Sequence, residues 1–97
     1  MSQTQKQIQI RASDEVVRGV YANAMQVAHS REEFTLDFLN LYPHQGAGVA
    51  VARVITSPGH MKRLIAALAD NVKKYESQFG TIQEAAAPSD TEVGFNA

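Results

Sequence analysis

The feature that most constrains this chain is a long amphipathic segment bounded by Ser57 and Gly80. Ser57 suits the N-cap of a helix, Pro58 suits the first helical position, and Gly80 can adopt the left-handed conformation that ends a helix. Large apolar residues recur between them at alternating spacings of four and three, which places them on one face. They are Met61, Ile65, Leu68, Val72, Tyr75 and Phe79. A helix of this length needs an apolar partner surface roughly 30 Å long.

Four segments before this helix carry strand patterns. Residues 8–12 and 34–39 alternate apolar and polar side chains, and residues 49–56 form a β-branched run typical of a central strand buried on most of both faces. Residues 16–29 fit two patterns, a helix face capped by Asp14 or an alternating strand. The polar connector 30–33 favours a hairpin and therefore the strand interpretation.

These elements predict an α+β fold. We expect an antiparallel sheet of about four strands followed by one long C-terminal helix packed on one face, in the order β-β-β-β-α. Pro43 should end the second arm of the hairpin because proline cannot donate to a strand ladder.

The chain divides by composition into three parts. Residues 1–7 are expected to form a polar arm, residues 8–82 a single α+β domain, and residues 83–97 an acidic polar tail. The small, polar residues of the tail are typical of a solubilising segment. The alternative is a peptide, anchored by Phe95, that docks on its own or a neighbouring subunit.

Composition also excludes several classes of protein. The net charge of −1 over 97 residues argues against a chain that wraps nucleic acid or lies on an anionic membrane. The absence of Cys excludes disulfides and thiolate metal sites and fits a reducing compartment. Neither an apolar run of about 20 residues nor a signal peptide is apparent in the sequence. A bacterial-style cytoplasmic protein is therefore expected.

Several short motifs together resemble a family of small bacterial proteins. The motifs are Val20-Tyr21-Ala22-Asn23, His29-Ser30, Glu33-Phe34, Leu36-Asp37-Phe38, Arg53-Val54-Ile55, Ser57-Pro58, Lys62-Arg63-Leu64, Ala67-Leu68, Asn71, Tyr75-Glu76 and Phe79-Gly80. On these residues the chain is similar, from about Ile8 to Ile82, to the domain-of-unknown-function family numbered 3467. The resemblance implies a fold but no activity, substrate or site. The order of elements is also similar to that of the export chaperone SecB, whose subunits pair through sheet edges and helices.

No pattern predicts a catalytic, cofactor-binding or metal site. The three histidines, His29, His44 and His60, lack the i, i+4 spacing of a helical zinc site. The start of the helix at Ser57 resembles an anion site, but it lacks the glycines of phosphate-binding loops and is interpreted as an ordinary capped terminus. The carboxylates of residues 31–33 fit a solvated hairpin tip, where no pocket separates their pKa values.

Polar residues inside the strand patterns are a separate candidate. If two of Asn23, Asp37 and Arg53 face the same side of adjacent strands, they can pair across the sheet. The alternatives are an exposed sheet face and a polar cluster buried at a subunit interface.

The apolar residues exceed what one helix can cover on one sheet face, which predicts self-association. The predicted interface combines the six helix residues named above with four sheet residues. These four are Tyr21, Met25, Phe34 and Phe38.

We therefore expect a non-enzymatic homo-oligomeric module, without cofactors, that binds an unknown protein or builds an assembly. A chaperone-like role is one function of this kind. The alternative is a nucleic-acid-binding regulator that uses Lys62, Arg63, Lys73 and Lys74, although a solvated basic face is the preferred interpretation of these residues.

Overall fold

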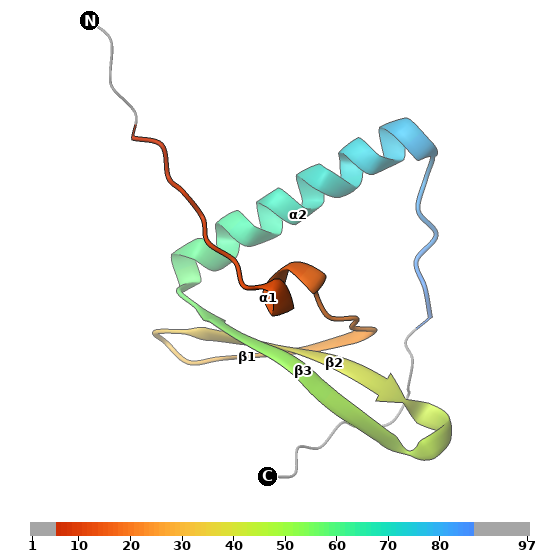
Figure 1. Cartoon of the computed structure of the whole chain (residues 1–97). Helices are drawn as coiled ribbons and strands as arrows, with labels where there is room; N and C mark the ends of the chain where they lie inside the picture. The colour runs from red at the N-terminus through yellow and green to blue at the C-terminus, as the bar shows by residue number, and fades with distance from the viewer. Residues whose placement is uncertain (1–5, 87–97) are drawn as a thin grey trace, which may run out of the picture.

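The computed structural model describes residues 6–86, which form an α+β arrangement of one sheet and one long helix (Figure 1). The elements are α1 (Asp14–Arg18), β1 (Ala24–His29), β2 (Phe34–Tyr42), the 3-10 turn η1 (Pro43–Gln45), β3 (Ala47–Thr56) and α2 (Pro58–Phe79). The antiparallel sheet and the long helix that follows it confirm the fold class predicted from the sequence.

The sheet is an antiparallel meander in the order β1-β2-β3. The predicted hairpin is confirmed, since residues 30–33 join β1 to β2. The backbone N–H of Ser30 donates to the carbonyl of Glu33 at 2.9 Å, and the Ser30 hydroxyl accepts from the N–H groups of Glu32 and Glu33. Ser30 therefore fixes the geometry of the turn.

The second hairpin turns at Pro43, as predicted, because β2 ends at Tyr42. Gly48 lies so close to β2 that a Cβ atom there would be 2.6 Å from the Leu41 side chain. Further along, Phe38 pairs with Ala52 and Leu39 with Ala50, which leaves one extra residue on β3 as a bulge. The bulge bends β3 next to the centre of the sheet.

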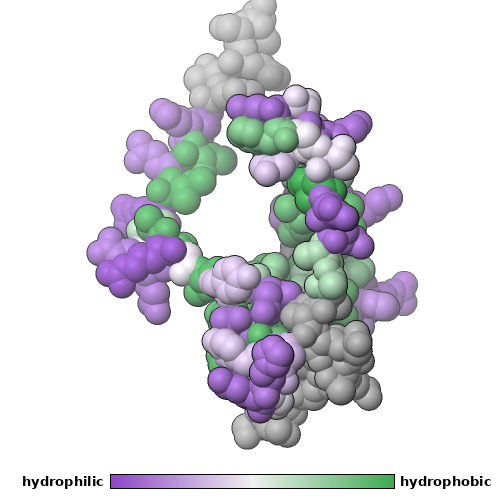
Figure 2. Space-filling view, turned by 90° about the vertical axis from the view of Figure 1, so that its right-hand side faces the viewer, coloured by the Kyte–Doolittle hydropathy of each residue, from purple (hydrophilic) through white to green (hydrophobic). Residues whose placement is uncertain are grey.

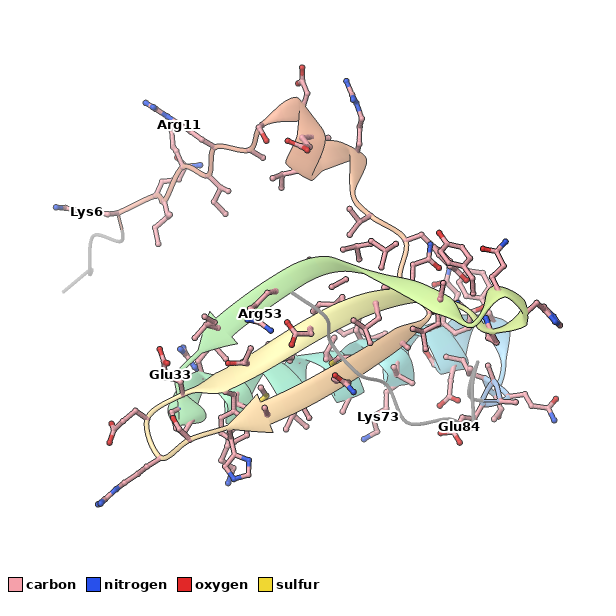
Figure 3. All side chains as sticks on the ribbon, turned by 90° about the horizontal axis from the view of Figure 1, so that it is seen from below. Lys6, Arg11, Glu33, Arg53, Lys73 and Glu84 are labelled. Carbon is pink, nitrogen blue, oxygen red and sulfur yellow. The ribbon has the colours of Figure 1, made fainter. Side chains whose placement is uncertain are left out.

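The sheet has three strands, so the prediction of about four is wrong for the described residues. Residues 8–12 are extended but pair with no strand within residues 6–86, and they lie apart from the sheet (Figure 3). Alternation matches a strand with one buried face, but a strand also needs a neighbouring edge to supply hydrogen bonds.

The strand interpretation of residues 16–29 is correct only for its second half. Ser13 caps α1 through a 3.3 Å hydrogen bond from the Val16 N–H to its hydroxyl, so Ser13, and not Asp14, is the cap. Gly19 ends this short helix and β1 begins at Ala24. The local cap outweighs the weak alternation of the first residues.

β3 was expected to be central, but it is an edge strand and β2 is central. Val49, Val54 and Ile55 of β3 are each about half exposed. Short antiparallel turns pair each strand with its neighbour in sequence, so the middle strand of the three occupies the centre. β-branched composition alone does not determine that position.

α2 begins and ends where the sequence predicts. The Ser57 hydroxyl accepts from the His60 N–H at 3.2 Å, and Gly80 adopts φ 99° while its N–H donates to the Glu76 carbonyl at 2.9 Å. The expectation that the helix packs along one face of the sheet is wrong for most of its length. Met61 is the only residue of α2 that is buried.

The core within residues 6–86 is small. Its buried apolar side chains are Leu36, Leu39 and Met61, which are 2–7% exposed. Figure 2 shows an open space framed by the N-terminal segment, α2 and the sheet, with apolar residues on its borders. A chain of this size would normally bury a larger core.

Candidate interaction surface

The apolar face of α2 is the most prominent exposed feature of the described residues. Five large side chains on it are between 46% and 67% exposed, although their spacing is that of a buried seam. This set, called the α2 stripe below, consists of Ile65, Leu68, Val72, Tyr75 and Phe79. Met61, the sixth residue of the predicted seam, is buried at the N-terminal end of the helix. The sequence identified the face, and the structure leaves most of it uncovered.

Local contacts hold the C-terminal end of the α2 stripe in place. The rings of Tyr75 and Phe79 are tilted against each other with centroids 5.0 Å apart. Just beyond the helix, the backbone N–H of Ile82 donates to the Glu76 carboxylate at 2.8 Å, which turns the chain back toward the helix. The two aromatic side chains therefore form a preorganised apolar end to the stripe.

A shallow hollow of about 330 Å³ lies near the N-terminal end of α2. It is lined by His60, Arg63, Leu64, Ala67 and Leu68. The lining supplies three apolar side chains, the Arg63 guanidinium and the His60 imidazole, and it contains no carboxylate. The hollow continues into the α2 stripe through Leu68.

The four sheet residues of the predicted interface differ in how far their side chains are exposed to solvent. Met25 is half exposed and is the register partner of Phe38, while Phe34 and Phe38 are partly buried on the central strand. Tyr21 precedes β1 and is largely exposed. Met25 and Tyr21 are thus the accessible members.

The sequence interpretation missed an apolar surface in the N-terminal segment. Its five large apolar side chains are 63–88% exposed, and Figure 3 shows the segment well separated from the strands. They are Ile8, Ile10, Val16, Val17 and Val20. The alternation of residues 8–12 was the available signal, but it was assigned to a strand of the chain's own sheet.

Two of the three predicted polar residues come together across neighbouring strands. The guanidinium of Arg53 on β3 binds the carboxylate of Asp37 on β2 through two hydrogen bonds, Nε to Oδ1 at 2.6 Å and Nη2 to Oδ2 at 3.0 Å (Figure 3). The Asp37 side chain is 11% exposed and that of Arg53 is 60% exposed. Hydrogen bonding from Arg53 lowers the pKa of Asp37 below its ordinary value, and the same contact raises the pKa of Arg53.

Asn23, the third predicted polar residue, lies elsewhere on the sheet. Its side-chain amide donates to the Leu41 carbonyl at 3.1 Å and accepts from the Leu41 N–H at 2.8 Å. Its own N–H donates to the Leu39 carbonyl. The Asn23 side chain therefore makes the pair of hydrogen bonds that the backbone of a strand residue would make, and it joins the start of β1 to the end of β2. It is not part of a cluster with Asp37.

The histidines lie apart from one another, at the end of β1, in η1 and at the start of α2. The ring of His29 contacts that of Phe34. Across residues 6–86, no group of three His, Cys, Asp or Glu side chains is arranged to hold a metal ion.

The basic residues of α2 lie outside the stripe. Lys73 extends outward from the helix (Figure 3), and Lys74 forms a 3.3 Å ion pair with Asp70 one turn earlier. In the described part of the chain, neither helix has the length and apolar character needed to span a bilayer.

Comparison with known families supports the resemblance carried by the sequence motifs. A family model described as a protein of unknown function, DUF3467, matches residues 1–84. The chain belongs to the DUF3467 family. No curated protein and no solved structure matches the chain significantly. Membership in DUF3467 therefore brings no assigned activity with it.

Proposed function

We propose that this protein is a non-enzymatic homo-oligomeric module that binds another protein or builds an assembly. The observation that carries this proposal is the exposed α2 stripe, a heptad seam without a partner inside the described chain. A heptad seam is the usual signature of a helix that packs along its whole length against another apolar surface.

The energetics favour association. Full burial of one large apolar side chain contributes roughly 1.5–3 kcal/mol, so five half-exposed residues leave about 5 kcal/mol unused in each chain. A small domain is stable by only about 5–15 kcal/mol in total. The unused burial is thus comparable with the whole stability of the fold.

The exposed apolar area also approaches the size of a specific interface. Large apolar side chains carry roughly 150–250 Å² each, so the α2 stripe presents on the order of 500 Å². A stable interface buries about 800 Å² on each partner. Further uncovered apolar area is present on Met25, which is half exposed, and on the N-terminal segment, whose large apolar side chains are 63–88% exposed.

The chemistry of the described residues fits a binding role. The Asp37–Arg53 ion pair lowers the pKa of the carboxyl and raises that of the guanidinium, and it joins two neighbouring strands. Such a pair fixes strand register. A chaperone-like role, the likeness to SecB and a cytoplasmic location stay predictions.

Light scattering on the full chain tests the proposal directly. We expect a molar mass that is a multiple of 10.6 kDa at micromolar concentrations and that falls toward the monomer on dilution. A mass of 10.6 kDa over the whole accessible concentration range would contradict the proposal.

A further inference from the structure

We infer that the α2 stripe is covered by α2 of a second copy of this chain, running antiparallel, with the two-fold axis passing between Ala69 and Asn71. This inference deepens the proposed function and rests on it, because it names the partner of the homo-oligomer and the register of the contact.

The apolar spacing sets the layers of such a pair. In heptad terms Ile65, Val72 and Phe79 are a positions, and Leu68 and Tyr75 are d positions, as is Met61. In an antiparallel pair each a residue lies opposite a d residue of the other helix. Placing Leu68 opposite Val72 of the second copy also places Ile65 opposite Tyr75.

This register uses the side chains that are free in the structure. Leu68, Val72, Ile65 and Tyr75 are about half exposed or more, so the four inner layers are available to a partner. Met61 is buried within its own subunit, so the outermost layers contribute Phe79 alone.

The flanking positions favour the antiparallel direction. In an antiparallel pair, flanking residues of the same heptad type meet, which brings Lys62 of one helix beside Glu76 of the other, twice by symmetry. Ala69 then meets Ala69, and Asn71 meets Asn71, so no like charges are opposed. A parallel pair would set Asn71 beside Glu76 and would leave Lys62 without an acidic neighbour.

The two charged side chains are available for this contact. Lys62 is exposed and has no ion-pair partner within residues 6–86. Glu76 uses one carboxylate oxygen to accept from the Ile82 N–H, which leaves its other oxygen for a lysine. The helix dipoles add a further preference, since each positive N-terminus then lies near a negative C-terminus.

Single cysteines distinguish the two directions, and the chain contains no native Cys. Ala69→Cys places two thiols together at the axis of the antiparallel pair but on opposite sides of a parallel one. Ile65→Cys places its two thiols together in a parallel pair, whereas in the antiparallel pair they lie about 15 Å apart along the helix axis. Arg63→Cys, on the outer face, is the control for random collision.

We expect a short bifunctional maleimide to convert Ala69→Cys protein into a covalent dimer at least five times faster than Ile65→Cys or Arg63→Cys protein. Faster cross-linking of Ile65→Cys, or equal rates for the three variants, would overturn the antiparallel register. Circular dichroism on each variant checks that its helix content is unchanged.

Charge reversal provides an independent measurement. Lys62→Glu and Glu76→Lys should each weaken dimerisation roughly tenfold at low salt, because each opposes like charges twice. The double variant Lys62→Glu/Glu76→Lys should return to within about threefold of the original affinity. The Ile82 hydrogen bond to Glu76 is lost in Glu76→Lys and in the double variant alike, so it does not affect the comparison between these two proteins. A double variant that dimerises no more tightly than Glu76→Lys would contradict the proposed contact.

The experiments distinguish the homo-oligomeric function from the antiparallel pairing of α2. A wild-type chain that stays monomeric refutes the homo-oligomeric function and the helix pairing together. A wild-type oligomer whose Ala69→Cys variant does not cross-link, and whose charge reversals have no effect, refutes the helix pairing alone.

Discussion

Leu68→Asp is the most direct perturbation of the α2 stripe. Leu68 is the second of its five residues and is 61% exposed in the single chain, so the substitution removes little packing within the subunit. In an assembly covered along α2, however, the same position is enclosed. The substitution therefore separates the stability of the oligomer from the folding of the chain.

The magnitude follows from the exposed fraction. Full burial of a leucine side chain contributes about 1.5–3 kcal/mol, so the exposed 61% leaves about 1–2 kcal/mol to be gained on association. A symmetric dimer contains two such positions, which gives about 2–4 kcal/mol. Each 1.4 kcal/mol is tenfold in Kd, so losing the leucine alone weakens the dimer at least about thirtyfold. Burying an unpaired aspartate adds to this loss.

Sedimentation equilibrium over a wide concentration range measures the effect. Ala66→Asp is the matched control, because it introduces the same charge on the same helix away from the α2 stripe. We expect Leu68→Asp protein to be largely monomeric where wild-type and Ala66→Asp proteins are oligomeric. Equal dissociation constants for the two variants would refute the conclusion that the stripe is an interface.

Three further predictions concern the fold. Leu36→Ala should lower the free energy of unfolding by about 2–3 kcal/mol in urea titrations. This is near the low end for a buried leucine, because its register partner Val54 is half exposed and can relax into the space. A loss below about 1 kcal/mol would show that Leu36 is not part of the core. The pKa of Asp37 is lowered by Arg53, so this pair stabilises the fold above the ordinary carboxyl pKa, and the stabilisation is lost as pH falls through the lowered value. Asp37→Asn should therefore flatten the acid side of a stability–pH curve, and an unchanged curve would contradict the assignment. A chain ending at Ile82 should keep cooperative melting with a midpoint within a few degrees of the full chain, and loss of cooperativity would show that the tail is structural; most of this tail, including the proposed docking residue Phe95, lies outside the described residues.

Features determined by local chemistry were predicted correctly. The limits of α2 follow from the Ser57 hydroxyl, the fixed φ of Pro58 and the positive φ of Gly80, which are properties of single residues and their nearest neighbours. The β1–β2 hairpin and the end of β2 at Pro43 depend in the same way on short-range hydrogen bonding. The sequence singled out Asn23, Asp37 and Arg53 but not which two would pair, and the register of β2 and β3 is what brings Asp37 opposite Arg53.

The remaining features depend on contacts between segments far apart in the chain. Residues 8–12 carry a strand pattern, yet a strand exists only where another edge supplies hydrogen bonds, and none of the strands within residues 6–86 pairs with them. β3 has the composition of a central strand, but the order of the turns makes it an edge. The sequence by itself determined which face of α2 is apolar, since that depends on helical periodicity. Only the tertiary structure decided that most of this face is left open, because whether a surface is covered depends on where the rest of the chain lies.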